Sequence, residues 1–142
     1  MNKFKDEVFG EIFHDIDFIK KYEIYIFNKN IKVHFCINVD EFSEISSHHR
    51  QTFIEFEKNK KEIIRKIENT AIEYCKTNYA ALNENEILAS LELVTIIIYR
   101  KCTKNERIIG FVIDDEYDLE MGIGIEMINE EIHAVGTQHL VC

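Results

Sequence analysis

Hydrophobic and polar residues alternate along the first forty residues, a pattern typical of β-strands. The clearest case is residues 31–39, where Ile, Val and Phe at the odd positions alternate with Lys, His, Cys and Asn at the even positions. Residues 22–27 are also rich in β-branched and aromatic side chains, and a shorter strand is predicted at 10–13. Asn28-Lys29-Asn30 lies between the two long runs and predicts a hairpin turn, because asparagine tolerates the left-handed conformation.

A helical pattern follows these strands. Between about residues 48 and 79, apolar residues recur at spacings of three and four while charged residues occupy the other positions, which predicts one long amphipathic helix. Ser46 and Ser47 are candidate N-caps, because a serine oxygen can accept a hydrogen bond from the free amides of the first turn. Asn83 followed by Glu86 predicts the cap of a short second helix that ends near residue 90.

The last third of the chain returns to strand patterns. Residues 93–99 form a nearly continuous apolar run typical of a central strand, and further strands are predicted at 107–113, 122–127 and 133–139. Asn129-Glu130 is the predicted turn between the last two strands. The whole pattern indicates an α+β fold. We expect a mainly antiparallel sheet of about six to seven strands, in strand-rich N- and C-terminal parts, with one long central helix and one short helix.

The size and composition of the chain fit this fold. Its 142 residues, 46% hydrophobic and 30% charged, suit a single domain over residues 1–142 with an ordinary buried core. No stretch approaches the roughly 18 apolar residues of a membrane span, and the first residues contain no apolar segment typical of a secretory signal. Cys36, Cys75, Cys102 and Cys142 are widely spaced, with no C-x-x-C pair. We therefore expect free thiols in a cytoplasmic protein without membrane contact.

The distribution of charge along the chain is more informative about function than the overall composition. The formal net charge is −9 and the pI is near 5.1, which disfavours direct nucleic-acid binding, because phosphate contacts need clustered Lys and Arg. Residues 1–50 carry −2 and residues 51–110 carry +1, whereas residues 111–142 hold eight acidic residues and no Lys or Arg. The excess begins with five carboxylates: Asp114, Asp115, Glu116, Asp118 and Glu120. Such a run is typical of a partner-facing surface or of a solvated loop, and the sequence leaves both open.

The carboxylate run lacks the setting that catalysis or metal binding requires. A calcium loop starting at Asp114 would need glycine at its sixth position and glutamate at its twelfth, but Leu119 and Ile125 stand there. The sequence places no histidine or nucleophile to work with the run. The adjacent pair His48-His49 at the helix start predicts a capping or surface role. We therefore predict no catalytic residue, no metal and no cofactor.

Three glycines in the last third form a candidate structural motif. Gly122, Gly124 and Gly136 fall in or beside predicted strands, where glycine costs stability. Glycine at such positions usually marks a bulge or a close approach of two backbones. We expect these three to shape the chain and not to cradle a phosphate, since the G-x-G-x-x-G spacing and a following helix are absent.

Several segments of the chain resemble a bacterial domain family of unknown biochemical activity. They are Phe9-Gly10-Glu11-Ile12, Asp118-Leu119-Glu120-Met121-Gly122-Ile123-Gly124-Ile125 and Val135-Gly136-Thr137-Gln138, together with the two early strand patterns and the long helix. Members of this family are cytoplasmic α+β domains, and relatives occur beside polymorphic toxins as immunity proteins. The resemblance implies an immunity protein of the contact-dependent growth inhibition type, which binds and neutralises one cognate toxin domain.

The resemblance and the charge distribution lead to one hypothesis with two alternatives. Many such toxins are nucleases with basic substrate clefts. A surface made of Asp114, Asp115, Glu116, Asp118 and Glu120 would therefore be steered to a basic toxin domain such as a nuclease. The protein would act by binding and not as an enzyme. The alternatives are a non-enzymatic structural or regulatory domain, for example one that self-associates through a sheet edge, and a small metal-dependent enzyme that uses the same carboxylates.

Overall fold

The computed structural model describes residues 2–40, 43–79, 82–100 and 105–142. They form one sheet of eight strands, three α-helices and a short 3₁₀ turn, so the predicted α+β class is confirmed. In chain order the elements are β1 (Asn2–Asp6), β2 (Gly10–His14), β3 (Phe18–Ile26), β4 (Lys29–Ile37), α1 (Ser47–Lys58), α2 (Lys60–Asn78), α3 (Glu84–Ser90), β5 (Leu91–Ile98), β6 (Ile108–Asp115), β7 (Ile123–Ile128), β8 (Glu131–Gly136) and the 3₁₀ turn η1 (Gln138–Leu140).

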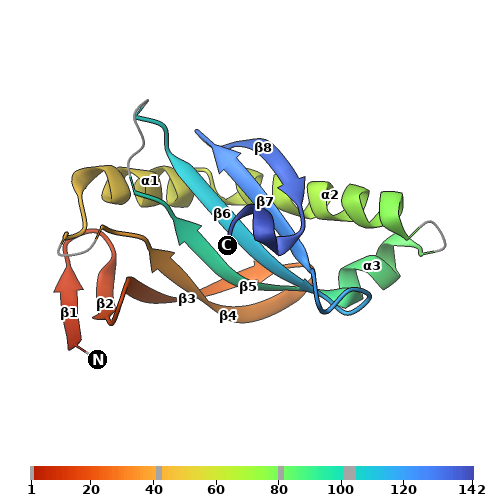
Figure 1. Cartoon of the computed structure of the whole chain (residues 1–142), viewed down its shortest axis with the longest axis horizontal. Helices are drawn as coiled ribbons and strands as arrows, with labels where there is room; N and C mark the ends of the chain where they lie inside the picture. Colours follow the sequence, from red (N-terminus) through yellow and green to blue (C-terminus); the bar gives the residue numbers. More distant parts are fainter. Residues whose placement is uncertain (1, 41–42, 80–81, 101–104) are drawn as a thin grey trace.

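The strands follow one another across the sheet in chain order (Figure 1). Every neighbouring pair is antiparallel except β4 and β5, which are parallel. A parallel pair needs a long crossover connection, and α1, α2 and α3 supply it here. The crossover lays α1 and α2 along one face of the sheet, whereas η1 and the C-terminus lie against β6 and β7 on the other face (Figure 1).

Two tight hairpins connect β3 to β4 and β7 to β8. Asn129 and Glu130 form the second turn, as predicted, with φ angles of 49° and 65° that fit a type I′ turn. The first turn lies one residue earlier than the pattern predicts. Phe27 and Asn28 form it, with φ angles of 55° and 59°, and Lys29 already belongs to β4.

The single long helix of the prediction is wrong, because the structure has two helices in its place. α1 ends at Lys58 and α2 begins at Lys60. Asn59 stands between them with φ −107° and ψ 17°, and its side-chain amide donates to the carbonyl of Glu55 at 2.8 Å. The backbone amide of Asn59 also donates to the Glu55 carbonyl, at 3.1 Å, so the helical bond is kept and the interruption lies in the non-helical backbone angles of Asn59. Asparagine side chains that bond to nearby backbone favour such angles.

Both predicted helix starts are confirmed. The side chain of Ser46 caps α1 by accepting the amide of His49, and the side chain of Asn83 caps α3 by accepting the amide of Glu86. In each cap the third helical residue also accepts the amide of the capping residue, which completes a capping box. The predicted short helix is therefore α3, and it ends at Ser90.

β1 is the strand that the sequence pattern misses, and it brings the sheet to eight strands instead of the predicted six to seven. Four of its residues, Asn2, Lys3, Phe4 and Lys5, are exposed, and only Asp6 is buried. A strand that is exposed along most of its length has no apolar alternation to reveal it. Pairing with β2 over five residue pairs holds it at the sheet edge.

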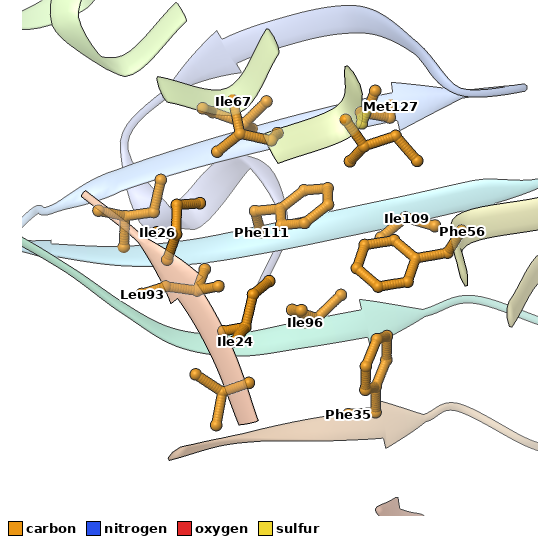
Figure 2. Close-up of a cluster of buried hydrophobic side chains, with 14 of the residues drawn as sticks. Ile24, Ile26, Phe35, Phe56, Ile67, Leu93, Ile96, Ile109, Phe111 and Met127 are labelled. Atoms are coloured by element: carbon orange, nitrogen blue, oxygen red, sulfur yellow. The ribbon is translucent and has the colours of Figure 1, made fainter. Parts of the chain in front are cut away.

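The core lies between the sheet and the two long helices (Figure 2). It includes Ile24, Phe35, Phe56, Ile67, Phe111 and Met127. Phe35 of β4 and Phe56 of α1 are fully buried, and their rings meet edge-on with centroids 5.3 Å apart. The alternating pattern of β4 and the helical stripe of α1 and α2 therefore cover each other, as a two-layer fold requires.

Two remaining sequence predictions concern the thiols and membrane spans. Cys36, Cys75 and Cys142 are free, and Cys102 lies outside the described residues. Within the described part of the chain, no helix has the length and apolar character needed to cross a membrane.

Candidate partner-binding surface

The acidic run lies where β6 ends and the chain turns into β7, and we call residues 114–121 the acidic loop. Asp114 is exposed at the end of β6, Glu116 and Glu120 are exposed in the turn, and Asp118 is half-buried. Four of the five carboxylates predicted to face a partner therefore reach the surface.

Asp115 is the exception, and its assignment to a partner-binding surface is wrong. It is only 1% exposed, because strand alternation places it on the same side of β6 as the core residue Ile113. Its Oδ1 atom accepts the backbone amide of Tyr117 at 3.0 Å, and the thiol of Cys75 approaches Oδ2 at 3.9 Å. Asp115 therefore stabilises the loop as a buried hydrogen-bond acceptor.

The buried carboxylate of Asp115 also raises the pKa of two neighbouring groups, a thiol and a tyrosine hydroxyl. Burial, and then the charge of Asp115, raises the pKa of the Cys75 thiol to about 12. Burial, Asp115 and Asp118 raise the pKa of the Tyr79 hydroxyl to about 12. Both groups stay protonated near neutral pH, so neither is an activated nucleophile.

Hydrogen bonds tie the acidic loop to its surroundings. The amide of Glu116 donates to the carbonyl of Ser90 at 3.0 Å, which joins the loop to the end of α3. The carboxylate of Asp118 accepts the amide of Met121 at 3.3 Å, and its backbone carbonyl accepts the amide of Gly122 at 2.9 Å. These bonds give the loop a defined shape.

The eight acidic residues of the last 32 positions fall into two groups. One group is buried or lies beside a basic side chain: Asp115 is buried, Glu130 pairs with Arg107, Glu131 pairs with Lys66, and Glu126 lies 3.9 Å from His133, which is charged only when protonated. The other group consists of Asp114, Glu116, Asp118 and Glu120. In the part of the chain that the structure describes, none of these four has a cationic partner within 4 Å. Within these 32 residues, the exposed run of carboxylates without a Lys or Arg partner is therefore in the loop.

Strand pairing adds one more exposed carboxylate to this surface. Glu92 of β5 lies directly opposite Asp114 of β6 in the antiparallel register. Like charges in this position destabilise a sheet. Glu92 is separated from the acidic run along the chain, so only knowledge of the strand pairing could have found it. Together with Asp114, Glu116, Asp118 and Glu120 it forms what we call the acidic surface.

Two apolar side chains stand among these carboxylates. Tyr117 is 50% exposed and Leu119 is 75% exposed, although both are large hydrophobic residues. The ring of Tyr117 leans against that of Tyr79, with centroids 6.0 Å apart. Both side chains therefore offer apolar area to a partner within one short loop.

Two of the three motif glycines are required by close contacts around the loop. Gly122 has φ +56°, and a Cβ there would lie 2.3 Å from Gln138 Nε2 and 2.7 Å from the carbonyl oxygen of Ile113. A Cβ at Gly124 would lie 2.6 Å from a carbonyl oxygen of the segment that precedes η1. Gly136 pairs with Gly124 across the strands, but the nearest atom to its Cβ position is 3.9 Å away. Contacts thus explain the first two glycines and not the third.

Gln138 links the two ends of the acidic loop, a role that sequence reasoning missed. Its backbone amide donates to the carbonyl of Met121 at 2.9 Å. Its side-chain Nε2 donates to the carbonyl of Ile113 and to Asp114 Oδ1, both at 2.9 Å. In the sequence, Gln138 stands out only as part of the segment Val135-Gly136-Thr137-Gln138 that resembles the domain family. That resemblance assigns no role to Gln138 itself.

A second polar cluster lies at the start of α1, at the other end of the sheet (Figure 1). His49 is 3% exposed; its Nδ1 accepts the amide of Ser46 at 3.1 Å, and its Nε2 lies 2.7 Å from the carbonyl oxygen of Asn38. Since an amide only donates and a carbonyl only accepts, the ring proton belongs on Nε2. Burial lowers the pKa of His49 below its ordinary 6.5, so the ring is neutral. The predicted capping role is confirmed for this histidine.

The neighbours of His49 make similar long-range contacts. His48 Nε2 lies 2.8 Å from the carbonyl oxygen of Glu106. Arg50 donates to both carboxylate oxygens of Asp6, with an Nη2–Oδ1 distance of 2.8 Å. Burial by itself would raise the pKa of Asp6, but hydrogen bonds from Arg50 and two backbone amides outweigh it, so the pKa lies below its ordinary value. This cluster ties α1 to the sheet.

The carboxylates of the acidic surface do not converge on a common centre. Across the described ranges, no group of three or more His, Cys, Asp or Glu side chains is arranged to hold a metal ion. The surface is a set of separate charges around two apolar side chains. That arrangement suits contact with a macromolecule better than capture of an ion.

Comparison with known proteins places the chain in a family. Residues 8–142 match the family described as Domain of unknown function (DUF6985), and the chain belongs to this family. The match covers the acidic loop, the motif glycines and Gln138, and it leaves out β1. No curated protein and no solved structure matches the chain. The family description assigns no activity.

Proposed function

We propose that this protein is an immunity protein that binds and neutralises a cognate bacterial toxin domain through the acidic surface. The observation that carries the proposal is the difference between the two groups of carboxylates. Glu130 and Glu131 are paired with cations within the chain, whereas the loop carboxylates are left without one among the described residues. Charges that the protein leaves uncompensated are available to a partner of opposite sign.

The charge of the acidic surface determines the kind of partner it fits. A toxin domain that acts on nucleic acid needs a basic cleft for phosphate groups. An acidic surface is steered toward such a cleft, because complementary charge raises the rate of association and disfavours acidic partners. We therefore propose a basic toxin domain such as a nuclease, met in the cytoplasm, with inhibition by binding and without catalysis.

The apolar side chains of the loop supply the hydrophobic contact area that the carboxylates cannot. Stable interfaces have an apolar centre with aromatic anchors and a polar rim. Tyr117 and Leu119 are exposed at the centre of the loop, and Glu116, Asp118 and Glu120 surround them along the chain. Tyr117 and Leu119 would be the anchors, and the carboxylates would form the rim that sets specificity and rate of binding.

Co-purification with the toxin domain encoded by the adjacent upstream gene tests this proposal. We expect wild-type protein to bind that domain. A variant with D114N, E116Q, D118N and E120Q should lose at least about tenfold in affinity, mainly through a slower association rate. Asp115 stays unchanged because it is buried.

A matched control separates the surface from the total charge. D15N, E23Q, E62Q and E73Q remove four exposed carboxylates elsewhere and change the net charge by the same amount. This control should bind within about threefold of wild type. Equal affinity of wild type and both variants would refute the acidic surface. Stoichiometric metal in the purified protein would favour the alternative of a metal-dependent enzyme, and a stable dimer without toxin binding would favour a structural or regulatory domain.

A further inference from the structure

The C-terminal segment is built to hold the acidic loop in one shape. Gln138 contacts the strand before the loop through Ile113, the loop itself through Asp114, and the end of the loop through Met121. One side chain and its own backbone amide therefore bridge both ends of the loop. The close fit of Gln138 against Gly122 leaves no room for a Cβ there.

The segment that carries Gln138 is itself fixed, independently of the loop. Val141 is buried, and its side chain lies against two glycines on neighbouring strands, where a Cβ would come within 3.0 Å at Gly110 and 3.1 Å at Gly124. The hydroxyl of Tyr99 donates to the carbonyl of Val141. Figure 1 shows this C-terminal turn lying across β6 and β7. The anchor therefore does not depend on the loop that it holds.

We propose that Gln138 is a positioning residue for partner binding, because it preorganises the loop that carries Tyr117 and Leu119. This inference rests on the function proposed above. A loop that is ordered before binding avoids the entropy cost of ordering during binding, so its affinity for the partner is higher. Without the two side-chain hydrogen bonds, the loop must become ordered when the partner arrives.

The test compares Q138A with H139A, which alters the exposed neighbouring residue of the same turn. In the free protein, hydrogen exchange should speed up at least fivefold in Q138A for the loop amides of Tyr117, Asp118 and Met121. Affinity for the upstream-encoded toxin domain should fall about tenfold. H139A should match wild type in both measurements.

Q138E tests the hydrogen bonds themselves, because a simple loss of packing would not make hydrogen exchange in the loop depend on pH. At neutral pH its carboxylate has no proton to donate and faces Asp114, so the loop should exchange faster than in Q138A. Near pH 5, partial protonation restores a donor, and exchange relative to H139A at the same pH should return toward wild type.

The outcomes separate the inference from the proposed function. Faster loop exchange together with weaker binding supports the positioning role. Unchanged exchange in Q138A overturns it, and so does faster exchange with unchanged affinity, while the proposed function stands in both cases. If wild-type protein and H139A both fail to bind the toxin domain, the proposed function is overturned and the inference falls with it.

Discussion

The buried ring of His49 makes a specific prediction about stability and pH. Both of its nitrogens are committed, Nδ1 to the amide of Ser46 and Nε2 to the carbonyl of Asn38. A second proton on Nδ1 would displace the hydrogen bond from the Ser46 amide, although the Ser46 hydroxyl lies 2.8 Å away, and it would place a charge on a ring that is 3% exposed. Burial therefore lowers the folded-state pKa below the ordinary value of 6.5. In the unfolded chain the ring takes up the proton more readily.

The sign and size of the effect follow from proton linkage. Because the unfolded state binds more protons, the free energy of unfolding rises with pH. The contribution of His49 is fully present above pH 6.5 and is lost as the pH falls from 6.5 toward the lower folded-state pKa. One proton taken up on unfolding corresponds to a slope that approaches about 1.4 kcal/mol per pH unit in this window.

The variant His49→Gln should remove this slope. Glutamine at the third helical position completes a capping box, so its Oε1 can accept the Ser46 amide as Nδ1 does. The lost bond to Asn38 costs about 1 kcal/mol at every pH and leaves the slope unaffected. Urea unfolding between about pH 5 and pH 8 measures the difference between wild type and variant. His139→Gln, which alters an exposed histidine of η1, controls for the loss of a histidine. Parallel stability curves for wild type and His49→Gln would refute the reasoning.

Three further predictions concern the isolated protein. Gly122→Ala should lower the free energy of unfolding by about 2–4 kcal/mol, since its Cβ would meet backbone at positive φ. Gly136→Ala, whose Cβ would make only ordinary van der Waals contact with Leu140, should change it by less than about 1 kcal/mol. Arg50→Ala should cost about 3 kcal/mol in urea unfolding, because it strands a buried carboxylate, and a loss below about 1 kcal/mol would contradict this. Thiol labelling read by peptide mass spectrometry should modify exposed Cys142 well before Cys75, and equal rates would show that burial does not protect Cys75.

Local sequence patterns predicted most of the secondary structure, because helix caps and strand alternation depend on residues only a few positions apart. The N-caps at Ser46 and Asn83 depend on residues three positions apart, and both are present. The break at Asn59 was not predictable from the apolar stripe, because the stripe continues through it and the interruption is confined to the backbone angles of one residue. β1 gave no signal because it contributes little to the core.

The candidate site was predictable in part. The run of carboxylates located the loop, but its five residues do not share one environment, because the alternation of β6 continues through Ile113 to Asp115. That alternation was the available signal that Asp115 points inward. Glu92 and Gln138 join the site through pairing and packing with distant segments, and no local pattern reports such contacts.

The acidic surface brings together four carboxylates of the last 32 residues that have no Lys or Arg within 4 Å among the described residues. Elsewhere in the last 32 residues, Arg107 pairs with Glu130 and Lys66 pairs with Glu131. At the end of β6 it instead sets Asp114 opposite Glu92, a like-charge pair that weakens the sheet. Sequences that are consistent with their fold break a local rule mainly where function requires it. A basic partner would offset this cost on binding, which is the behaviour that the proposed function requires of the acidic surface.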